Sequence, residues 1–137
     1  MIGIVLLSHG NMAEGMAETC TLFFGSHIDG LTSCCLQEGI SPEQFDRQID
    51  EAIGRVDDGH GVILMCDMFG GTPANRAMKK AADRVAVVTG MNLPMLLELL
   101  GKRLAAEDLS DIDISALLDT SRTGIKWINE LMKAHKA

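Results

Sequence analysis

The chain has 137 residues and a net charge of −7 at pH 7, and hydrophobic residues make up 47% of it. That length predicts one domain, residues 1–137, which can bury enough surface to fold without a metal or a disulfide. The acidic charge repels nucleic-acid phosphates and therefore excludes nucleic acid as an expected partner.

The N-terminal apolar run spans only Ile4 to Leu7, which is too short for a signal peptide, and no segment approaches the roughly 20 apolar residues of a membrane span. We therefore expect a cytoplasmic protein with no direct insertion into a membrane. The four cysteines lack the CxxC spacing of metal ligands, so we expect reduced thiols and neither a metal nor a cofactor.

The first half of the chain alternates apolar runs with helical periodicity, which is typical of a parallel α/β sheet. Residues 2–7 and 31–36 are predicted strands. Ser41-Pro42-Glu43-Gln44 predicts a helix start, because Ser41 and Gln44 can form a capping box around a proline at the first helical position. A helix between the two strands is expected to turn Met12, Met16, Cys20 and Phe23 inward. The helix that starts at Ser41 is expected to turn Phe45, Ile49, Ile53 and Val56 inward.

The second half continues the alternation. Residues 61–66 and 85–89 are predicted strands, and a helix starting at Thr72-Pro73 between them is expected to turn Ala74, Ala77, Met78 and Ala81 inward. Asn92-Leu93-Pro94 begins a further helix, and residues 107–113 form an acidic loop. Residues 117–132 carry a last amphipathic pattern, but Gly124 weakens its middle, so residues 123–128 (TGIKWI) are either helix or strand.

Functional side chains are predicted at the ends of the first and third strands. Ser8-His9-Gly10 ends the first, and Asp67 ends the third, shortly before Gly70-Gly71-Thr72. Ligands bind beyond the carboxyl ends of parallel strands, and if these two strands are neighbours, His9 and Asp67 lie side by side. A carboxylate that fixes the imidazole tautomer makes the other ring nitrogen a better nucleophile.

The residues that follow Asp67 suit a phosphoryl group. Gly70-Gly71 lets the backbone approach a ligand closely, and Thr72 opens a helix whose free N–H groups favour an anion. Each signal has an ordinary interpretation when taken alone: a hydrogen-bonded histidine, a turn-capping aspartate and a loop that leads into a helix. Their coincidence at two strand ends favours a phosphoryl-accepting histidine. His27, His60 and His135 fall in loop or tail contexts and are expected to be solvated.

These motifs together resemble a known family. Ser8-His9-Gly10, Asp67 with Phe69-Gly70-Gly71-Thr72-Pro73-Ala74-Asn75, and Met91-Asn92-Leu93-Pro94-Met95-Leu96 are similar, in order and spacing, to the enzyme IIA component of the mannose family of the bacterial phosphoenolpyruvate-dependent sugar phosphotransferase system (PTS). The likeness covers nearly the whole chain. Phe69 and Ala74 depart from it, since the best-known members carry a larger aromatic and a phenylalanine there; both changes would reshape the rim that meets partners.

The resemblance implies a fold, a reaction and partners. The fold is an open, doubly wound α/β structure with a mainly parallel sheet of four strands in the order 2-1-3-4, helices on both faces, and a fifth edge strand exchanged in a homodimer. His9 would be the phosphoryl acceptor, taking the group from the phosphocarrier protein HPr and passing it to a separate IIB component during sugar uptake. Asp67 would orient His9, while Ser8, Gly70, Gly71 and Thr72 bind the phosphoryl group.

Two other classes of protein remain open at this stage. Small metal chelatases of tetrapyrrole synthesis also end their first strand in a His-Gly turn, but they need a second metal-ligating histidine, and His60 and His135 are poorly placed for that role. A IIA-like regulatory module would be phosphorylated in the same way and would then act on another protein instead of passing the group on. Which sugar is transported does not follow from these residues.

Overall fold

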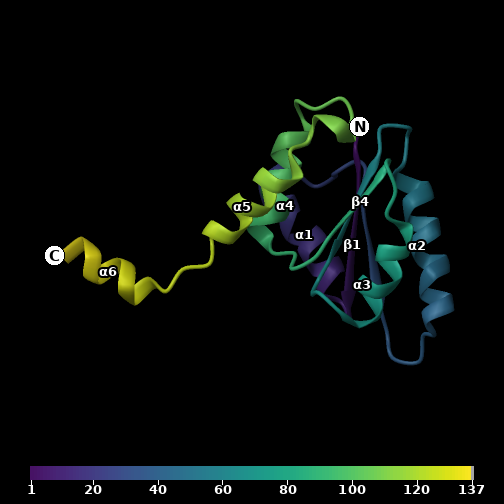
Figure 1. The fold of residues 1–137 in the computed structure, drawn as a ribbon, viewed down its shortest axis with the longest axis horizontal. Helices are drawn as coiled ribbons and strands as arrows, with labels where there is room; N and C mark the ends of the chain where they lie inside the picture. The colour runs from purple at the N-terminus through teal and green to yellow at the C-terminus, as the bar shows by residue number, and fades with distance from the viewer. Residues whose placement is uncertain (137) are drawn as a thin grey trace.

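Strands and helices alternate along the chain in the computed structural model, which describes residues 1–136 (Figure 1). The strands are β1 (Gly3–His9), β2 (Leu31–Leu36), β3 (Val62–Cys66) and β4 (Val85–Val88). The helices are α1 (Met12–Phe24), α2 (Pro42–Val56), α3 (Gly71–Ala77), α4 (Leu93–Arg103), α5 (Ile114–Thr123) and α6 (Ile128–Lys136), with short 3-10 turns at Met78–Lys80 and Leu109–Asp111.

The four strands form one parallel sheet in the order β2-β1-β3-β4, which confirms the predicted fold class and strand order. The two central strands are apolar at nearly every position because both of their faces are covered. Helices α1, α4 and α5 cover one face, and α2 and α3 cover the other (Figure 1). Alternate side chains of β1 serve the two faces: Ile4 and Leu6 contact the first helix layer, and Val5 and Leu7 contact the second.

The helix starts follow the local sequence closely. The Ser41 side chain accepts a hydrogen bond from the Gln44 N–H, and the Gln44 side chain accepts one from the Ser41 N–H, which completes the predicted capping box. Asn92 caps α4 with a single bond: its side-chain oxygen accepts from the Met95 N–H at 2.8 Å. Helix α4 then buries Met95, Leu96, Leu99 and Leu100 against the sheet.

The predicted inward faces of α1 and α3 were partly wrong. Cys20 is buried as predicted, but Met12 and Phe23 are exposed, and Ala13 rather than Met12 faces the sheet. The Ala13 N–H donates to the buried Ser8 hydroxyl at 2.8 Å, and this bond rotates the first turn so that the small side chain faces inward. Met78 is exposed because α3 ends at Ala77 and the chain tightens into a 3-10 turn there.

The C-terminal part of the chain leaves the body of the protein. Helix α5 ends at Thr123, residues 124–127 have no regular structure, and α6 stands apart from the sheet and its helices (Figure 1). We call residues 124–136 the arm. In this single chain residues 123–128 are therefore neither a continuous helix nor a strand. Among residues 1–136, no helix is long and apolar enough to cross a membrane.

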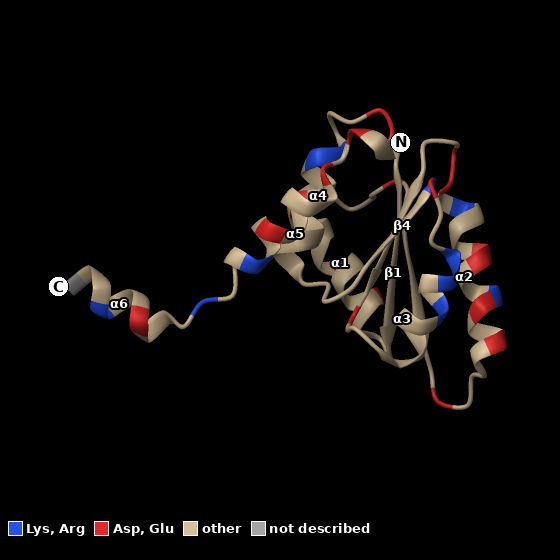
Figure 2. Ribbon diagram, in the orientation of Figure 1, with Lys and Arg blue, Asp and Glu red and all other residues tan. Residues whose placement is uncertain are grey.

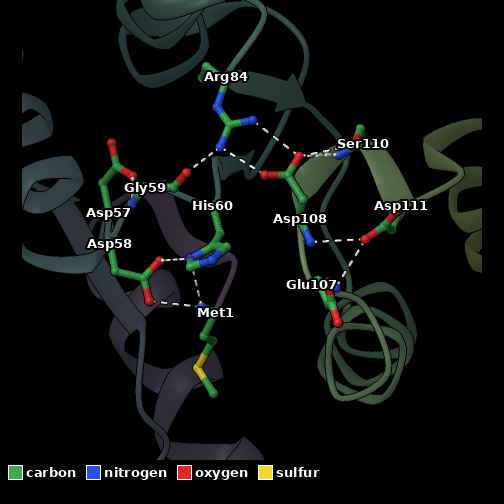
Figure 3. Close-up of polar contacts among 10 residues, drawn as sticks. All are labelled: Met1, Asp57, Asp58, Gly59, His60, Arg84, Glu107, Asp108, Ser110 and Asp111. Carbon is green, nitrogen blue, oxygen red and sulfur yellow. Dashed lines mark hydrogen bonds and ion pairs between the residues drawn. The ribbon is translucent and has the colours of Figure 1, made fainter.

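The lysine, arginine, aspartate and glutamate residues lie on the helices and loops and not on the four strands (Figure 2). A network of charges ties the strand starts together at the end of the sheet opposite His9 (Figure 3). The Arg84 guanidinium binds both carboxylate oxygens of Asp108, at 2.9 and 3.1 Å. Its hydrogen bond, with those from Ser110, lowers the pKa of Asp108 to about 2. Hydrogen bonds from the Met1 ammonium and from His60 likewise lower the pKa of Asp58 to about 2.

Candidate functional site

The sheet register brings His9 and Asp67 together, as the strand ends predicted. His9 is the last residue of β1, and Asp67 directly follows β3, the neighbouring strand. The Asp67 N–H donates to the Leu7 carbonyl at 2.9 Å, which continues the ladder between the two strands as far as the site. The Asp67 side chain is 10% exposed and the His9 side chain is 48% exposed, so a largely buried carboxylate supports an accessible imidazole.

Both oxygens of Asp67 are held by hydrogen bonds. Oδ2 accepts from the His9 backbone N–H at 2.9 Å and lies 2.7 Å from His9 Nδ1, while Oδ1 accepts from the Met68 N–H at 2.9 Å. Partial burial acts to raise the pKa of Asp67, but these hydrogen bonds and the charge of His9 outweigh it, so the pKa lies below its ordinary value. The carboxylate is therefore ionised at neutral pH, and Nδ1 must carry the proton that it donates. The lone pair of the neutral ring is then on Nε2.

Gly71 lies directly against the free edge of the imidazole. A Cβ atom placed on Gly71 would lie 2.9 Å from His9 Cε1 and 3.1 Å from Nε2, closer than side-chain carbons tolerate. Its φ of +82° is also a conformation that favours glycine. Helix α3 begins here with Gly70 as its N-cap, no side chain caps it, and the partly buried Thr72 follows in its first turn. The backbone at the start of α3 therefore borders Nε2.

Ser8 has a different place from the one predicted. Its side chain is fully buried, accepts a hydrogen bond from the Ala13 N–H at 2.8 Å and donates to the Gly10 carbonyl at 3.0 Å. Both bonds fix the turn between β1 and α1, so the hydroxyl has no access to a group bound at Nε2. Gly10 completes that turn with a φ of +59°, and its N–H donates to the Leu36 carbonyl at 2.8 Å.

The other histidines lie away from this site. His27 pairs with Asp29, His60 pairs with Asp58 at the opposite edge of the sheet, and His135 is on α6 in the arm. Within residues 1–136, no group of three or more histidine, cysteine or acidic side chains is arranged to hold a metal ion. The geometry therefore offers no second histidine ligand beside His9 of the kind that a chelatase needs.

A large apolar groove, which the sequence did not predict, begins beside this site and follows the outer edge of β4. Its volume is about 610 Å³. One end is formed by Phe69 and Gly70, the residues just before Gly71. The walls come from α3 and the 3-10 turn after it, from β4 and from α5, and include Ala74, Met78, Val87, Val88, Ile114 and Leu118. Phe69 and Met78 are large apolar side chains that are exposed, and their exposure marks the groove. The sequence alone does not show which apolar side chains are exposed, so it could not predict the groove.

Fold and site together define a class: a doubly wound α/β protein whose carboxylate-oriented histidine lies at the carboxyl edge of the sheet. Comparison with known proteins agrees. Residues 3–116 match the EIIA-man family model, described as PTS system fructose IIA component. The chain is 31% identical over 113 residues to the PTS system fructose-specific EIIA component of Bacillus subtilis, which covers 80% of this chain and 77% of that protein.

Two further comparisons extend this match. The chain is 28% identical over 129 residues to the PTS system mannose-specific EIIAB component of Escherichia coli, covering 91% of this chain but only 39% of that longer protein. The crystal structure of a phosphotransferase system component EIIA from Streptococcus agalactiae superposes with a TM-score of 0.83 at 25% identity, covering 95% of this chain and 99% of that one. The chain therefore belongs to the EIIA-man family and is a PTS IIA component that transfers phosphoryl groups in sugar uptake.

Proposed function

We propose that His9 accepts a phosphoryl group at Nε2 from phosphorylated HPr and passes it to a separate IIB component in the cytoplasm. The observation that carries this proposal is the 2.7 Å contact between His9 Nδ1 and the ionised Asp67, because it leaves the lone pair on the accessible nitrogen. In the transfer, the Nε2 lone pair attacks phosphorus and the bond to the HPr phosphohistidine nitrogen breaks. The electron pair of that bond stays with HPr, and the proton on Nδ1 stays in place.

Asp67 acts as an orienting residue and as a counter-charge in this proposal. Phosphorylation of Nε2 gives the imidazole ring a positive charge while Nδ1 remains protonated, and a carboxylate 2.7 Å away stabilises that charge. The backbone of Gly70 and Gly71 and the hydroxyl of Thr72 then hold the phosphoryl oxygens. The absence of a side chain on Gly71 supports this role, because the chain approaches Nε2 there more closely than any other residue would allow.

We further propose that the protein is a homodimer in which residues 123–128 of each chain form the edge strand beside β4 of the other. The outer edge of β4 has no strand partner in the described part of the chain, and the arm carries apolar side chains out into solvent. Unpaired sheet edges are templates for strand addition from a second chain. Sedimentation at micromolar concentration should therefore give twice the chain mass of 14.8 kDa, and a folded species near 14.8 kDa would contradict the dimer.

The transfer itself is tested with phosphoenolpyruvate, enzyme I and HPr. The purified protein should take up about one acid-labile phosphate per chain, His9→Ala should take up none, and single alanine replacements of His27, His60 or His135 should behave as wild type. Stoichiometric phosphorylation of the His9→Ala variant would contradict the assignment. Subsequent transfer to a IIB component distinguishes the carrier from a purely regulatory module, which would hold its phosphate in the presence of IIB.

A further inference from the structure

The groove and the phosphoryl site share one loop. Phe69 and Gly70 form the end of the groove, and the next residue, Gly71, contacts the imidazole of His9. Whatever fills the groove therefore lies against the loop that positions the backbone next to Nε2. Phe69 is 87% exposed in the single chain, which is a large apolar surface to leave in water beside a reactive group.

The arm starts at the rim of the same groove. Ile125 is one of its lining residues, and Gly124 lies next to Pro94 at the start of α4. From that point the arm runs away from the body of the protein (Figure 1). Trp127 is 67% exposed, and the arm shows further exposed apolar side chains at Ile125, Ile128, Leu131 and Met132. The arm thus carries apolar side chains that its own chain leaves uncovered, directly beside an apolar groove.

Apolar complementarity and symmetry favour a second copy of this chain as the partner that fills the groove. The lining of the groove within residues 1–136 is mainly apolar, with Arg122 as its one charged residue. It therefore matches the exposed apolar side chains of the arm. Each arm leaves from the rim of its own groove. If two chains are related by a two-fold axis beside β4, the arm of each chain runs along the groove of the other. Such an arrangement is an isologous interface, in which both subunits use the same surface.

We propose that the partner's arm completes the phosphoryl-transfer site: residues 125–128 of one subunit lie in the groove of the other, cover Phe69, and hold the loop at Gly70 and Gly71 in place against His9. This inference rests on the exchanged dimer of the proposed function and goes beyond it, because it makes the activity of each His9 depend on the arm of the other subunit. Misplacement of a binding group by about 1 Å costs roughly a hundredfold in rate. Loss of the partner's arm should therefore slow transfer at least tenfold.

Mixed dimers test this dependence directly. Trp127→Asp places a charge in the arm, at a position that is exposed in the single chain, so the body should still fold. The Trp127→Asp homodimer should transfer phosphate from phospho-HPr at least tenfold more slowly than wild type. A mixed dimer of one Trp127→Asp subunit and one His9→Ala subunit can be made by co-expression and purified through two different tags. Its Trp127→Asp subunit should transfer phosphate at a rate within about twofold of wild type, because its groove receives the intact arm of the His9→Ala subunit.

Two controls separate this result from its alternatives. A mixed dimer of Trp127→Asp with the double variant His9→Ala/Trp127→Asp should stay slow, because both of its arms are altered. Asn129→Asp, which adds the same charge at a polar position of α6, should transfer at the wild-type rate. The proposal would be overturned by any of four results. Two concern the transfer rate of the mixed dimers: equal recovery with the His9→Ala and the His9→Ala/Trp127→Asp partner, or no recovery in an isolated mixed dimer. The other two are a wild-type transfer rate in the Trp127→Asp homodimer and failure of any mixed dimer to form.

The same design distinguishes this inference from the proposed function. If wild-type protein accepts no phosphate on His9, the phosphoryl-transfer proposal itself fails. If wild type transfers normally but recovery in the mixed dimer is absent, only the role of the partner's arm fails. Trp127, the single tryptophan, adds a readout that involves no chemistry: its emission should be blue-shifted in the dimer and red-shifted on dilution to monomer. An emission in the dimer equal to that of the unfolded chain would contradict burial of the arm.

Discussion

Replacing Gly71 with alanine should damage the reaction much more than the fold. The added Cβ would lie 2.9 Å from His9 Cε1, whereas the distance between two carbon atoms in ordinary contact is at least about 3.5 Å. The imidazole must therefore move by about 0.6 Å, away from the loop and out of line with Asp67. Since a 1 Å error in a reacting group costs about a hundredfold, the expected loss of transfer rate is about ten- to a hundredfold.

The same substitution also carries a backbone cost, which a control can isolate. Gly71 has a φ of +82°, and a left-handed conformation costs an alanine about 1–2 kcal/mol. Gly39 has a φ of +86° and nothing within 4 Å of an added Cβ. Gly39→Ala should therefore lower the free energy of unfolding by a similar amount, about 1–2 kcal/mol, and leave the rate of phosphoryl transfer unchanged.

The assay is single-turnover transfer from phospho-HPr, followed by rapid quench, together with chemical denaturation of both variants. Equal transfer rates for Gly71→Ala and Gly39→Ala, at equal stability, would refute the argument that Gly71 is present to make room for the imidazole. A Gly71→Ala rate loss that disappears when stability is restored by a ligand or an osmolyte would refute it as well.

Three further predictions concern the remaining charges and hydroxyls. Asp67→Asn should slow phosphoryl acceptance by roughly ten- to a thousandfold with an unchanged circular dichroism spectrum, and an unchanged rate would remove Asp67 from the mechanism. Thr72→Ala should slow transfer to IIB by roughly ten- to a hundredfold and Thr72→Ser hardly at all; equal rates for Thr72→Ala and wild type would exclude the hydroxyl contact. The pKa of Asp108 is lowered from 3.8 to about 2 in the folded protein, so its stabilising contribution is present above pH 4 and is lost as the pH falls toward 2. Denaturation at a series of pH values should show that the free energy of unfolding of Asp108→Asn falls less steeply below pH 4 than that of wild type. Equal pH dependence in the two proteins would contradict that role for the Arg84 pair.

Much of the fold could be predicted because its signals are local. The central strands are buried on both faces, so their sequences are continuous apolar runs, and the helix starts carry their own capping residues at Ser41 and Asn92. The pairing of His9 with Asp67 could be anticipated because the carboxyl ends of neighbouring parallel strands meet at one edge. These features depend on a few consecutive residues and on one rule of topology.

The features that were missed depend on contacts between one element and the next, which the periodicity of a single element does not show. Met12 fits the apolar periodicity of α1, yet Ala13 faces the sheet because the Ser8 hydroxyl holds its N–H. Ser8 was predicted to bind the phosphoryl group, but that same bond keeps its hydroxyl buried. The TGIKWI segment was ambiguous for a related reason: whether it forms a strand depends on a neighbouring strand, and the sheet within residues 1–136 does not include it.

The site of phosphorylation on the imidazole ring tests the central claim most directly. Protein labelled with nitrogen-15 in its histidines, phosphorylated by enzyme I and HPr and observed by NMR at alkaline pH, distinguishes phosphate on Nε2 from phosphate on Nδ1. Because Asp67 occupies Nδ1 and Gly71 borders Nε2, the result should be Nε2-phosphohistidine at His9 alone. Phosphate on Nδ1 of His9, or on any other histidine, would contradict the account.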